Sequence, residues 1–414
     1  MAVDTVKHNN IDVMKLVKDC LKVLRETEDR MEHVNIIIAG KTGVGKSTLI
    51  NAAFRGKMAD TGMGEPVTKE MEVIEKPGMP LRIYDSVGLE LTESTKQKTI
   101  DDIKDLIADK KEKNNPDEII HCMWYCVQAN SDRLEMPERD FIADIAEEIP
   151  VIMVITKAFR KNHAKELVKK FKTFRLPVRK ICIVLAQDDD DEDIKVKAYG
   201  LDELLKTTLN ILSASFSENT SDAFIHSQTS LEIKNQKAVE IVDQTVKMSF
   251  SEGFIPIPVA DIFMLLPTEM IMMARITSVY GLEMTQDKLK RILFIMFSSV
   301  GAASAAVFFA KGLLKVIPGI GTIAGGLLNG AAAAAMTQAF GRTYIFIMNK
   351  LYTGEMTEKD FETAEGREQI KKVMRGESEK KKIDENFKNI AQNMISNKPR
   401  KSIYSMIGGF FGKK

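Results

Sequence analysis

The chain has 414 residues, a length typical of two or three domains, and its net charge is only +1 although 28% of its residues are charged. Such a balance argues against a nucleic-acid partner. Four cysteines are too few for a disulfide framework, and the first thirty residues lack the apolar core of a secretory signal. We therefore expect an intracellular, cytoplasmic protein with reduced thiols.

Residues 1–33 contain apolar positions at helical spacing, which predict an amphipathic helix over 11–32. From residue 34 onward, short apolar runs alternate with helical stretches. This alternation predicts an α/β fold, doubly wound, with a mostly parallel sheet. Cys122 and Cys126 fall inside one apolar run, which indicates a buried strand rather than a metal site. The expected strands are 34–39, 81–85, 118–127, 150–156 and 180–186, and the expected helices are 46–54, 94–112, 136–148, 161–174 and 201–213.

After residue 215 the strand patterns stop and the composition changes. Residues 216–352 are helix-compatible and increasingly apolar, and 353–414 form a tail dense in both charge signs with an amphipathic end. The sequence thus predicts an N-terminal helix (1–33), an α/β domain (34–215), a helical apolar domain (216–352) and a charged tail (353–414).

The motif Gly40-x-x-x-x-Gly45-Lys46-Ser47 follows the first strand directly and precedes a helix, the context of a phosphate-binding loop. Its glycines let backbone amides surround phosphates, and the helix N-terminus adds its dipole. The Lys46 ammonium is expected on the β and γ phosphates and the Ser47 hydroxyl on magnesium. The alternative is a chance glycine-rich turn. The expected nucleotide-binding residues here are Gly40, Lys41, Thr42, Gly43, Val44, Gly45, Lys46, Ser47 and Thr48.

Three further positions favour a GTPase over other phosphate-loop proteins. Thr68 lies in a polar loop 21 residues after Ser47, where a switch threonine would complete the magnesium shell. Asp85-Ser86-Val87-Gly88 has the DxxG form, in which the Asp binds magnesium through water and the Gly amide contacts the γ phosphate. The expected metal ligands are therefore Ser47, Thr68 and Asp85, and the expected catalytic residues are Lys46, Thr68 and Gly88. Thr68 has the alternative of an ordinary loop residue.

The ends of the next two strands indicate the base-binding side. Thr156 and Lys157 close one strand, where a TKxD element would place the lysine stem against the base. Leu185-Ala186-Gln187 closes the next, where the Ala186 amide is positioned to read the guanine oxygen. Together with the phosphate loop, these elements predict binding of GTP and GDP.

Two positions depart from this pattern. Phe159 stands where the base-reading Asp belongs, so we expect weakened discrimination between guanine and adenine. The acidic run 188–193 is either a replacement carboxylate or, as we favour, a solvated loop. Leu89 follows Gly88 where some GTPases keep a water-orienting glutamine, which predicts slow intrinsic hydrolysis that is completed by an activating protein or a homodimer.

The chain resembles the Era-like G domains of the translation-factor-related GTPases. It is closest to a group in which IHxxWYC (120–126) and PVIxVxTK (150–157) accompany the phosphate loop. In that group a helical domain of unknown function follows, similar to 256–281 and to VIPGIG (316–321) here. The resemblance covers roughly residues 34–350 and implies GTP binding and hydrolysis with Mg²⁺ as cofactor.

The membrane question rests on two uncharged runs, 292–310 and 316–341. As a helix, the first would be about 28 Å long, close to the thickness of a bilayer core. A membrane hairpin over 292–341 and a soluble helical bundle both fit, because the many Ala and Gly residues make these runs only moderately hydrophobic. The apolar face of 400–414, framed by Arg and Lys, predicts an interfacial anchor or a segment docked on its own bundle.

These observations predict a GTP-binding protein that hydrolyses GTP slowly with magnesium and acts as a conformational switch at a membrane. Two alternatives stay open. An RNA or ribosome assembly GTPase would need a basic stripe or an added RNA-binding module, whereas the charges in 353–402 are mixed in sign. A nucleotide-binding scaffold with little turnover would fit Leu89.

Overall fold

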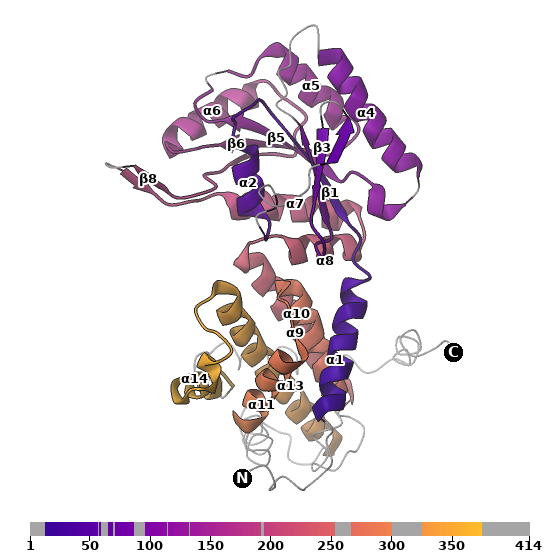
Figure 1. Ribbon diagram of the computed structural model, residues 1–414, viewed down its shortest axis with the longest axis vertical. Coiled ribbons are helices and arrows are strands. Elements are labelled where there is room, and N and C mark those ends of the chain that lie inside the picture. Colours follow the sequence, from indigo (N-terminus) through magenta and orange to yellow (C-terminus); the bar gives the residue numbers. More distant parts are fainter. Residues whose placement is uncertain are drawn as a thin grey trace. The chain divides into compact units, whose positions relative to one another are not determined.

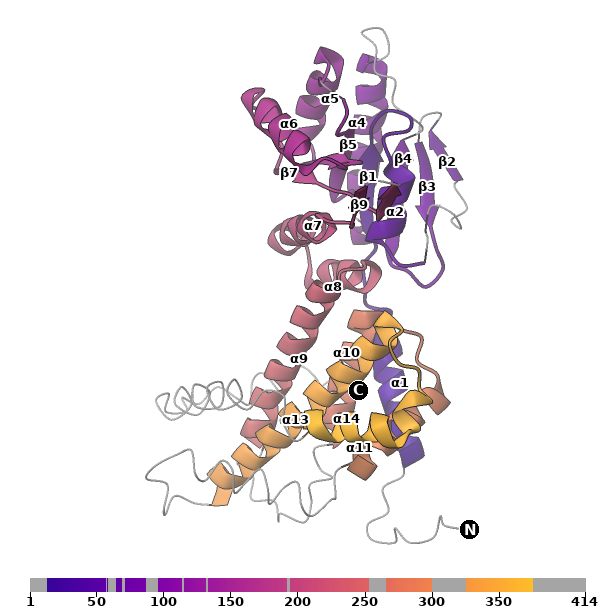
Figure 2. The same ribbon diagram turned by 90° about the vertical axis from the view of Figure 1, so that its left-hand side faces the viewer.

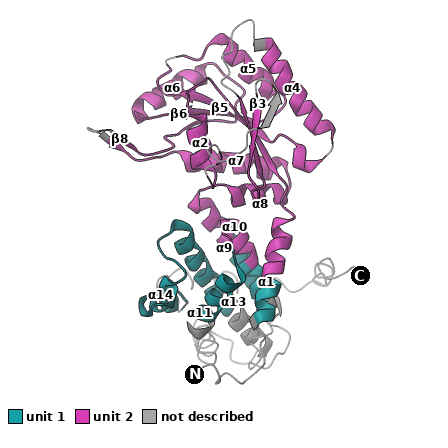
Figure 3. Cartoon of the chain, in the orientation of Figure 1, with its two compact units in different colours: residues 1–19, 239–273, 284–414 teal, residues 20–238, 274–283 magenta. Residues whose placement is uncertain are grey.

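The computed structural model divides into two compact units, formed by residues 20–238 with 274–283 and by residues 1–19, 239–273 and 284–414 (Figure 3). Three of the four dividing positions fall inside helices α1 (Val13–Glu28), α9 (Leu231–Glu252) and α10 (Leu266–Tyr280), and the fourth lies just after α10. The structure describes residues 13–56, 58, 65–68, 71–86, 96–113, 115–131, 133–191, 194–252, 266–299 and 325–374. The domain limits expected from the sequence stay a prediction.

Unit 2 of Figure 3, which comprises residues 20–238 and 274–283, is built on a seven-stranded sheet with the order β2-β3-β4-β1-β5-β6-β7 (Figure 1). Strands β4, β1, β5, β6 and β7 are parallel, and β2 and β3 join one edge antiparallel. The predicted α/β fold with a mostly parallel sheet is confirmed. The strands are β1 (Val34–Ala39), β2 (Glu65–Thr68), β3 (Met71–Glu75), β4 (Leu81–Ser86), β5 (Cys122–Gln128), β6 (Val151–Thr156) and β7 (Lys180–Ile183).

Helices cover both faces of this sheet, as Figures 1 and 2 show. All residues of β1 and β6 and the first six of β5 are buried, which explains the largely apolar sequences of these strands. One face packs on α4 (Lys96–Glu112), α5 (Met136–Ala146) and α6 (Lys161–Thr173) in a single apolar core. The other packs on α2 (Lys46–Ala53), α7 (Leu201–Ser215) and α8 (Glu218–Ser227). At its centre the buried Trp124 stacks on Phe54, with 5.6 Å between ring centroids.

Two segments differ from the sequence expectation. Thr68, expected in a polar loop, is the last residue of strand β2, where it pairs with Met71. The run expected as a solvated acidic loop contributes β8 (Asp189–Asp191), which pairs antiparallel with β9 (Ile194–Val196). Both segments are short and lack a continuous apolar run, so main-chain pairing rather than an apolar pattern forms them.

The described part of unit 1 of Figure 3, which comprises residues 1–19, 239–273 and 284–414, is helical, as expected. Besides parts of the shared helices it contains α11 (Gln286–Ser299), α13 (Gly325–Thr353) and α14 (Ala364–Met374), with a short 3-10 helix at Asp360–Glu362. Gly341 lets α13 approach α9 closely, because a Cβ there would lie 2.5 Å from a methyl carbon of Val242.

The segments on which the membrane prediction rests lie largely outside the described residues. This holds for residues 300–324 of the expected hairpin and for the whole of 400–414. Within the described ranges, we find no helix whose length and apolar character would suffice to cross a bilayer.

Candidate functional site

The loop between β1 and α2 has the backbone shape that the glycine spacing predicts. Gly40 has φ +145°, and a Cβ at this position would lie 2.4 Å from the Cys126 carbonyl oxygen. Gly45 has φ +100° and directly precedes the first turn of α2. L-residues rarely adopt either conformation, so both positions require glycine. The chain therefore turns tightly around the N-terminus of α2, which directs free backbone N–H groups and a positive dipole end toward the loop.

Lys46 lies inside this loop. Its side chain is 9% exposed, and its Nζ donates a hydrogen bond to the Gly40 carbonyl at 3.1 Å. The neighbouring Ser47 and Thr48 are exposed on the first turn of α2. The structure thus places a buried ammonium and two accessible hydroxyls together at a helix N-terminus, the arrangement that binds polyphosphate.

Asp85 supplies a carboxylate near Lys46 that fits a divalent cation. It is the last residue but one of β4, which lies beside β1, and it is in register with Ile38. Within the described part of the chain, its Oδ1 is buried without a hydrogen-bond partner, as is the Ser86 hydroxyl. Burial raises the pKa of Asp85 to about 6, against the opposing effect of the Lys46 ammonium. A buried carboxylate oxygen that lacks a donor is a suitable outer ligand for hydrated magnesium, so these residues fit the implied ion.

This pKa predicts a pH dependence of magnesium affinity. Below about pH 6 the free Asp85 carboxyl is protonated, so the apparent Mg²⁺ affinity of the nucleotide-bound protein should fall about tenfold per pH unit. Mg²⁺ titrations with a fluorescent GDP analogue between pH 5 and 7.5 would measure it. The phosphates of the nucleotide also titrate, and they do so in every variant, so Asp85→Asn is the control. If the Mg²⁺ affinity of the two proteins changes with pH in parallel, Asp85 is not a magnesium ligand.

The remaining predicted magnesium and γ-phosphate residues are only partly described. The main chain of Thr68 lies at the same end of the sheet as Asp85, because Thr68 pairs with Met71, and Met71 pairs with Ser86, the neighbour of Asp85. Gly88 and the adjoining Leu89 lie outside the described residues. Their predicted switch roles stay predictions.

The end of β6 is joined directly to the phosphate loop. The Thr156 hydroxyl donates to the Val44 carbonyl at 2.5 Å, and the Lys157 Nζ donates to the Gly43 carbonyl at 2.7 Å. Lys157 has φ +51°, an uncommon value for a residue with a side chain. Its stem passes the loop, since a Cβ on Gly45 would lie 3.5 Å from the Lys157 Cε. The structure therefore brings Thr156 and Lys157 together with the phosphate loop, whereas their predicted contact with the base stays a prediction.

Ala186 lies beside these residues, past the end of β7. The preceding Leu185 forms an antiparallel bridge with Tyr199, whose hydroxyl donates to the Ala158 carbonyl at 2.7 Å. Phe159 is 39% exposed next to this group. Asp188, the first candidate for a replacement base-reading carboxylate, accepts the Ala198 N–H at 2.7 Å. That bond uses the carboxylate to hold the loop before the β8–β9 hairpin.

A carboxylate on α5 was not predicted as part of the site. Glu138 is buried and accepts hydrogen bonds from the Tyr125 hydroxyl at 3.0 Å and from the Lys41 Nζ at 3.3 Å. Glu135 also accepts from Lys41, at 3.4 Å. Burial opposes the charge on Lys41, but the two carboxylates raise its pKa overall. The only sequence signal was the capping-box spacing of Glu135 and Glu138, which shows a helix start and not a contact with residue 41.

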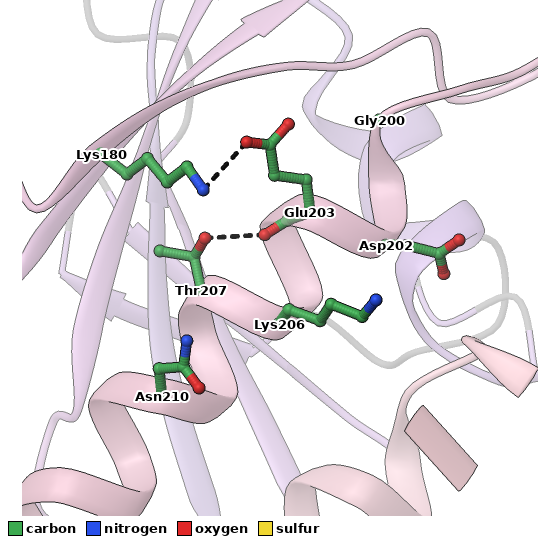
Figure 4. A pocket seen from close by; sticks show the side chains of 7 residues that line it. All are labelled: Lys180, Gly200, Asp202, Glu203, Lys206, Thr207 and Asn210. Atoms are coloured by element: carbon green, nitrogen blue, oxygen red, sulfur yellow. Dashed lines mark hydrogen bonds and ion pairs between the residues drawn. The ribbon is translucent and has the colours of Figure 1, made fainter. Parts of the chain in front are cut away.

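Two other features contribute nothing to this site. A surface hollow of about 520 Å³ lies beside α7, and no residue of the phosphate loop lines it. Figure 4 shows the lining side chains, among which Lys180 pairs with Glu203 at 2.9 Å. All four cysteines are buried, and burial raises the pKa of Cys122 and of Cys126 to about 12. Among the described residues, no cluster of His, Cys, Asp or Glu side chains would hold a metal ion.

Comparison with known proteins agrees with this geometry. Residues 35–157 match the family described as 50S ribosome-binding GTPase, and residues 225–383 match a domain of unknown function, DUF697. Neuronal-specific septin-3 of Rattus norvegicus is 26% identical over 164 residues, which cover 33% of this chain and 46% of the septin. Translocase of chloroplast 101 of Physcomitrium patens is 30% identical over 126 residues, covering 30% of this chain and 12% of that protein.

The chain therefore spans less than half the length of these curated relatives. Among solved structures, apo translation elongation factor SelB from Methanococcus maripaludis is 17% identical to this chain. The match covers 44% of this chain and 34% of the SelB chain, with a TM-score of 0.28, so no conclusion is based on it. The matched families and the loop geometry lead to one conclusion. The chain carries a P-loop GTPase domain followed by a domain of unknown function.

Proposed function

We propose that this protein binds and slowly hydrolyses GTP with magnesium, and that it works as a conformational switch of the Era-like type. The proposal rests on the observation that three functional groups come together at the carboxyl ends of the parallel strands. The buried Lys46 ammonium, the unpartnered Asp85 oxygen and the Lys157 stem all lie around the loop that precedes α2.

In this proposal the chain acts by positioning and by electrostatic stabilisation. Lys46 exchanges its contact with the Gly40 carbonyl for phosphate oxygens, and the backbone amides of the loop hold the remaining charge. Magnesium, held by Ser47, Thr68 and, through water, Asp85, would neutralise charge on the β and γ phosphates. The loops of Thr68 and Gly88 become ordered around the γ phosphate and are released after its loss.

Single-turnover hydrolysis tests this proposal against a scaffold without turnover. Protein in excess over labelled GTP and Mg²⁺ should release phosphate slowly but measurably faster than a Lys46→Ala variant. Slow release is expected because Leu89 cannot orient water, and an activating protein or a homodimer would then supply the missing group. If bound GTP is not hydrolysed faster than in the variant, the scaffold alternative is correct.

We predict a guanine preference that is present but reduced. Lys157 lies against the loop and Ala186 follows the Leu185 bridge, whereas position 159 offers an aromatic ring instead of a carboxylate. Competition of ATP against labelled GTP measures the preference directly. Discrimination beyond about a thousandfold, roughly 4 kcal/mol, would mean that another carboxylate reads the base. Asp188→Asn would then be the first variant to measure, since its carboxylate already lies in this loop.

We further propose that the helical part acts at a membrane, supported by the two uncharged runs of 292–341 and the basic, apolar segment 400–414. One relative is by its name a chloroplast translocase. The full chain should sediment with anionic vesicles. Removal by salt would identify the tail as the anchor, since ionic screening weakens binding to lipid headgroups, and removal only by detergent would identify an inserted hairpin. A chain that stays in the supernatant and is monodisperse without detergent would contradict both ideas.

A further inference from the structure

The C-terminal end of the P-loop helix α2 is bonded to the α8–α9 connection. The Thr229 hydroxyl donates to the Ala52 carbonyl at 2.6 Å, and the Thr229 N–H donates to the Ala53 carbonyl at 3.0 Å. In return, the Arg55 N–H donates to the Ser227 carbonyl at 3.0 Å. These bonds satisfy carbonyl groups that a helix end otherwise leaves free. A shift of α2 along its axis is thereby passed to the connection between α8 and α9.

Two cations extend this attachment to the end of α10. The Arg55 guanidinium donates to the His226 carbonyl at 2.8 Å and also to the Gly281 carbonyl. Lys234, on the first turns of α9, is fully buried and donates to the carbonyls of Ile225 at 2.7 Å and Val279 at 2.8 Å. The C-termini of α8 and α10 thus receive the same two side chains, whose positive charge complements both helix dipoles.

The burial of Lys234 shows that this contact is specific. Burial and the nearby Arg55 guanidinium lower the pKa of Lys234, while hydrogen bonds from its Nζ to three carbonyls favour the charged form. The third of these carbonyls belongs to His226, at 3.2 Å. An ammonium has three N–H donors, and each of these three carbonyls can accept one of them. These bonds join the ends of α8 and α10 through one side chain.

We infer that Arg55 and Lys234 are positioning residues through which the nucleotide state at the N-terminus of α2 reaches the last turn of α10. The inference rests on the proposed GTP cycle. It follows from the length of α2, because this helix runs from Lys46 at the phosphate site to Ala53 at the cluster and transmits displacement as a short rigid rod. Since the whole of α10 belongs to the matched domain of unknown function (residues 225–383), its last turn is a suitable output for the switch.

Hydrogen exchange of the full chain tests this inference with a non-hydrolysable GTP analogue and with GDP. We expect the amides of 277–281, which include the Gly281 N–H bonded to the Thr277 carbonyl at 3.0 Å, to exchange about fivefold or more slowly in one state. Lys234→Met should abolish that difference while nucleotide binding, measured on the same samples, is kept. A merely structural role would instead change exchange equally in both states.

Gly281→Ala is a second variant that removes no charge. Gly281 has φ +61°, and an added Cβ would lie 2.1 Å from an Arg55 nitrogen, so the flexible guanidinium must leave its carbonyl partners. Lys237→Met is the matched control, because Lys237 lies on the same helix but pairs with Glu218 and Asp222 of α8. It should keep the nucleotide-dependent difference.

Three results would overturn the inference. The first is a parent chain that binds both nucleotides with equal exchange in 277–281, and the second is a full difference in both Lys234→Met and Gly281→Ala. The third is loss of the difference in Lys237→Met as well, which would show general loosening of α9. A parent that binds no nucleotide would instead contradict the proposed function itself, and with it this inference.

Discussion

Replacing Lys46 by alanine should abolish detectable nucleotide binding while the fold is kept. The ammonium is buried in the phosphate loop and its present acceptor is a loop carbonyl, so the loss removes contacts made to phosphate without opening the apolar core. Two charge-assisted hydrogen bonds contribute about 1.5–3 kcal/mol each, so affinity should fall by at least about a hundredfold. Titration with a fluorescent GTP analogue measures the affinity, and circular dichroism checks the fold.

Lys41→Ala is the matched control, because the expected role of Lys41 in the same loop belongs to its backbone amide, which alanine keeps, whereas its ammonium is held by Glu135 and Glu138. It should keep most of the affinity. If Lys46→Ala binds GTP as tightly as the parent, the phosphate site is misassigned. If both variants lose binding equally, the general positive charge of the loop matters more than the position of Lys46.

The largest stability effect is expected for Trp124→Ala. The indole is fully buried, stacks on Phe54 and donates to the Thr208 hydroxyl at 3.1 Å, so it connects β5 with α2 and α7. Removing it leaves a large cavity, and the free energy of unfolding should fall by about 3–5 kcal/mol. Urea unfolding followed by circular dichroism measures this, since the substitution also removes the single tryptophan of the chain.

Thr208→Val separates the two contributions of this site. It keeps the packing but leaves the indole N–H without its acceptor, which should cost about 1–3 kcal/mol. A Trp124→Ala loss no larger than that of Thr208→Val would show that the cavity collapses and that packing contributes little.

The central parallel strands β1, β5 and β6 were predictable because they are buried on both faces. Their sequences are therefore continuous apolar runs, as in VIMVIT of β6, and the structure confirms them. Strand β2 was not predictable in this way. Its sequence, EPVT, contains a charge and a proline, and it forms because β3 offers a free edge for main-chain pairing. The pairing of β2 with β3 cannot be predicted from the composition of β2.

In the candidate site, too, local features were predictable from the sequence and contacts between distant residues were not. The loop from Gly40 to Ser47 was predictable because its chemistry is local: the glycine spacing sets the turn and the following helix sets the dipole. The contact between Lys41 and Glu138 spans 97 residues, and that between Arg55 and Gly281 spans 226. Such pairs depend on how the layers pack, and a single sequence carries no local signal for them.

The burial of the cysteines has a practical consequence. Thiolates react with maleimides, but burial raises the pKa of Cys20 to about 12 and that of Cys182 to about 11, as it does for the two thiols of β5. The native cysteines should therefore react little with maleimide dyes. A cysteine introduced at Met136, which is 59% exposed at the start of α5, would carry a dye close to the phosphate loop, because the preceding Glu135 accepts a hydrogen bond from Lys41. No native thiol would have to be removed.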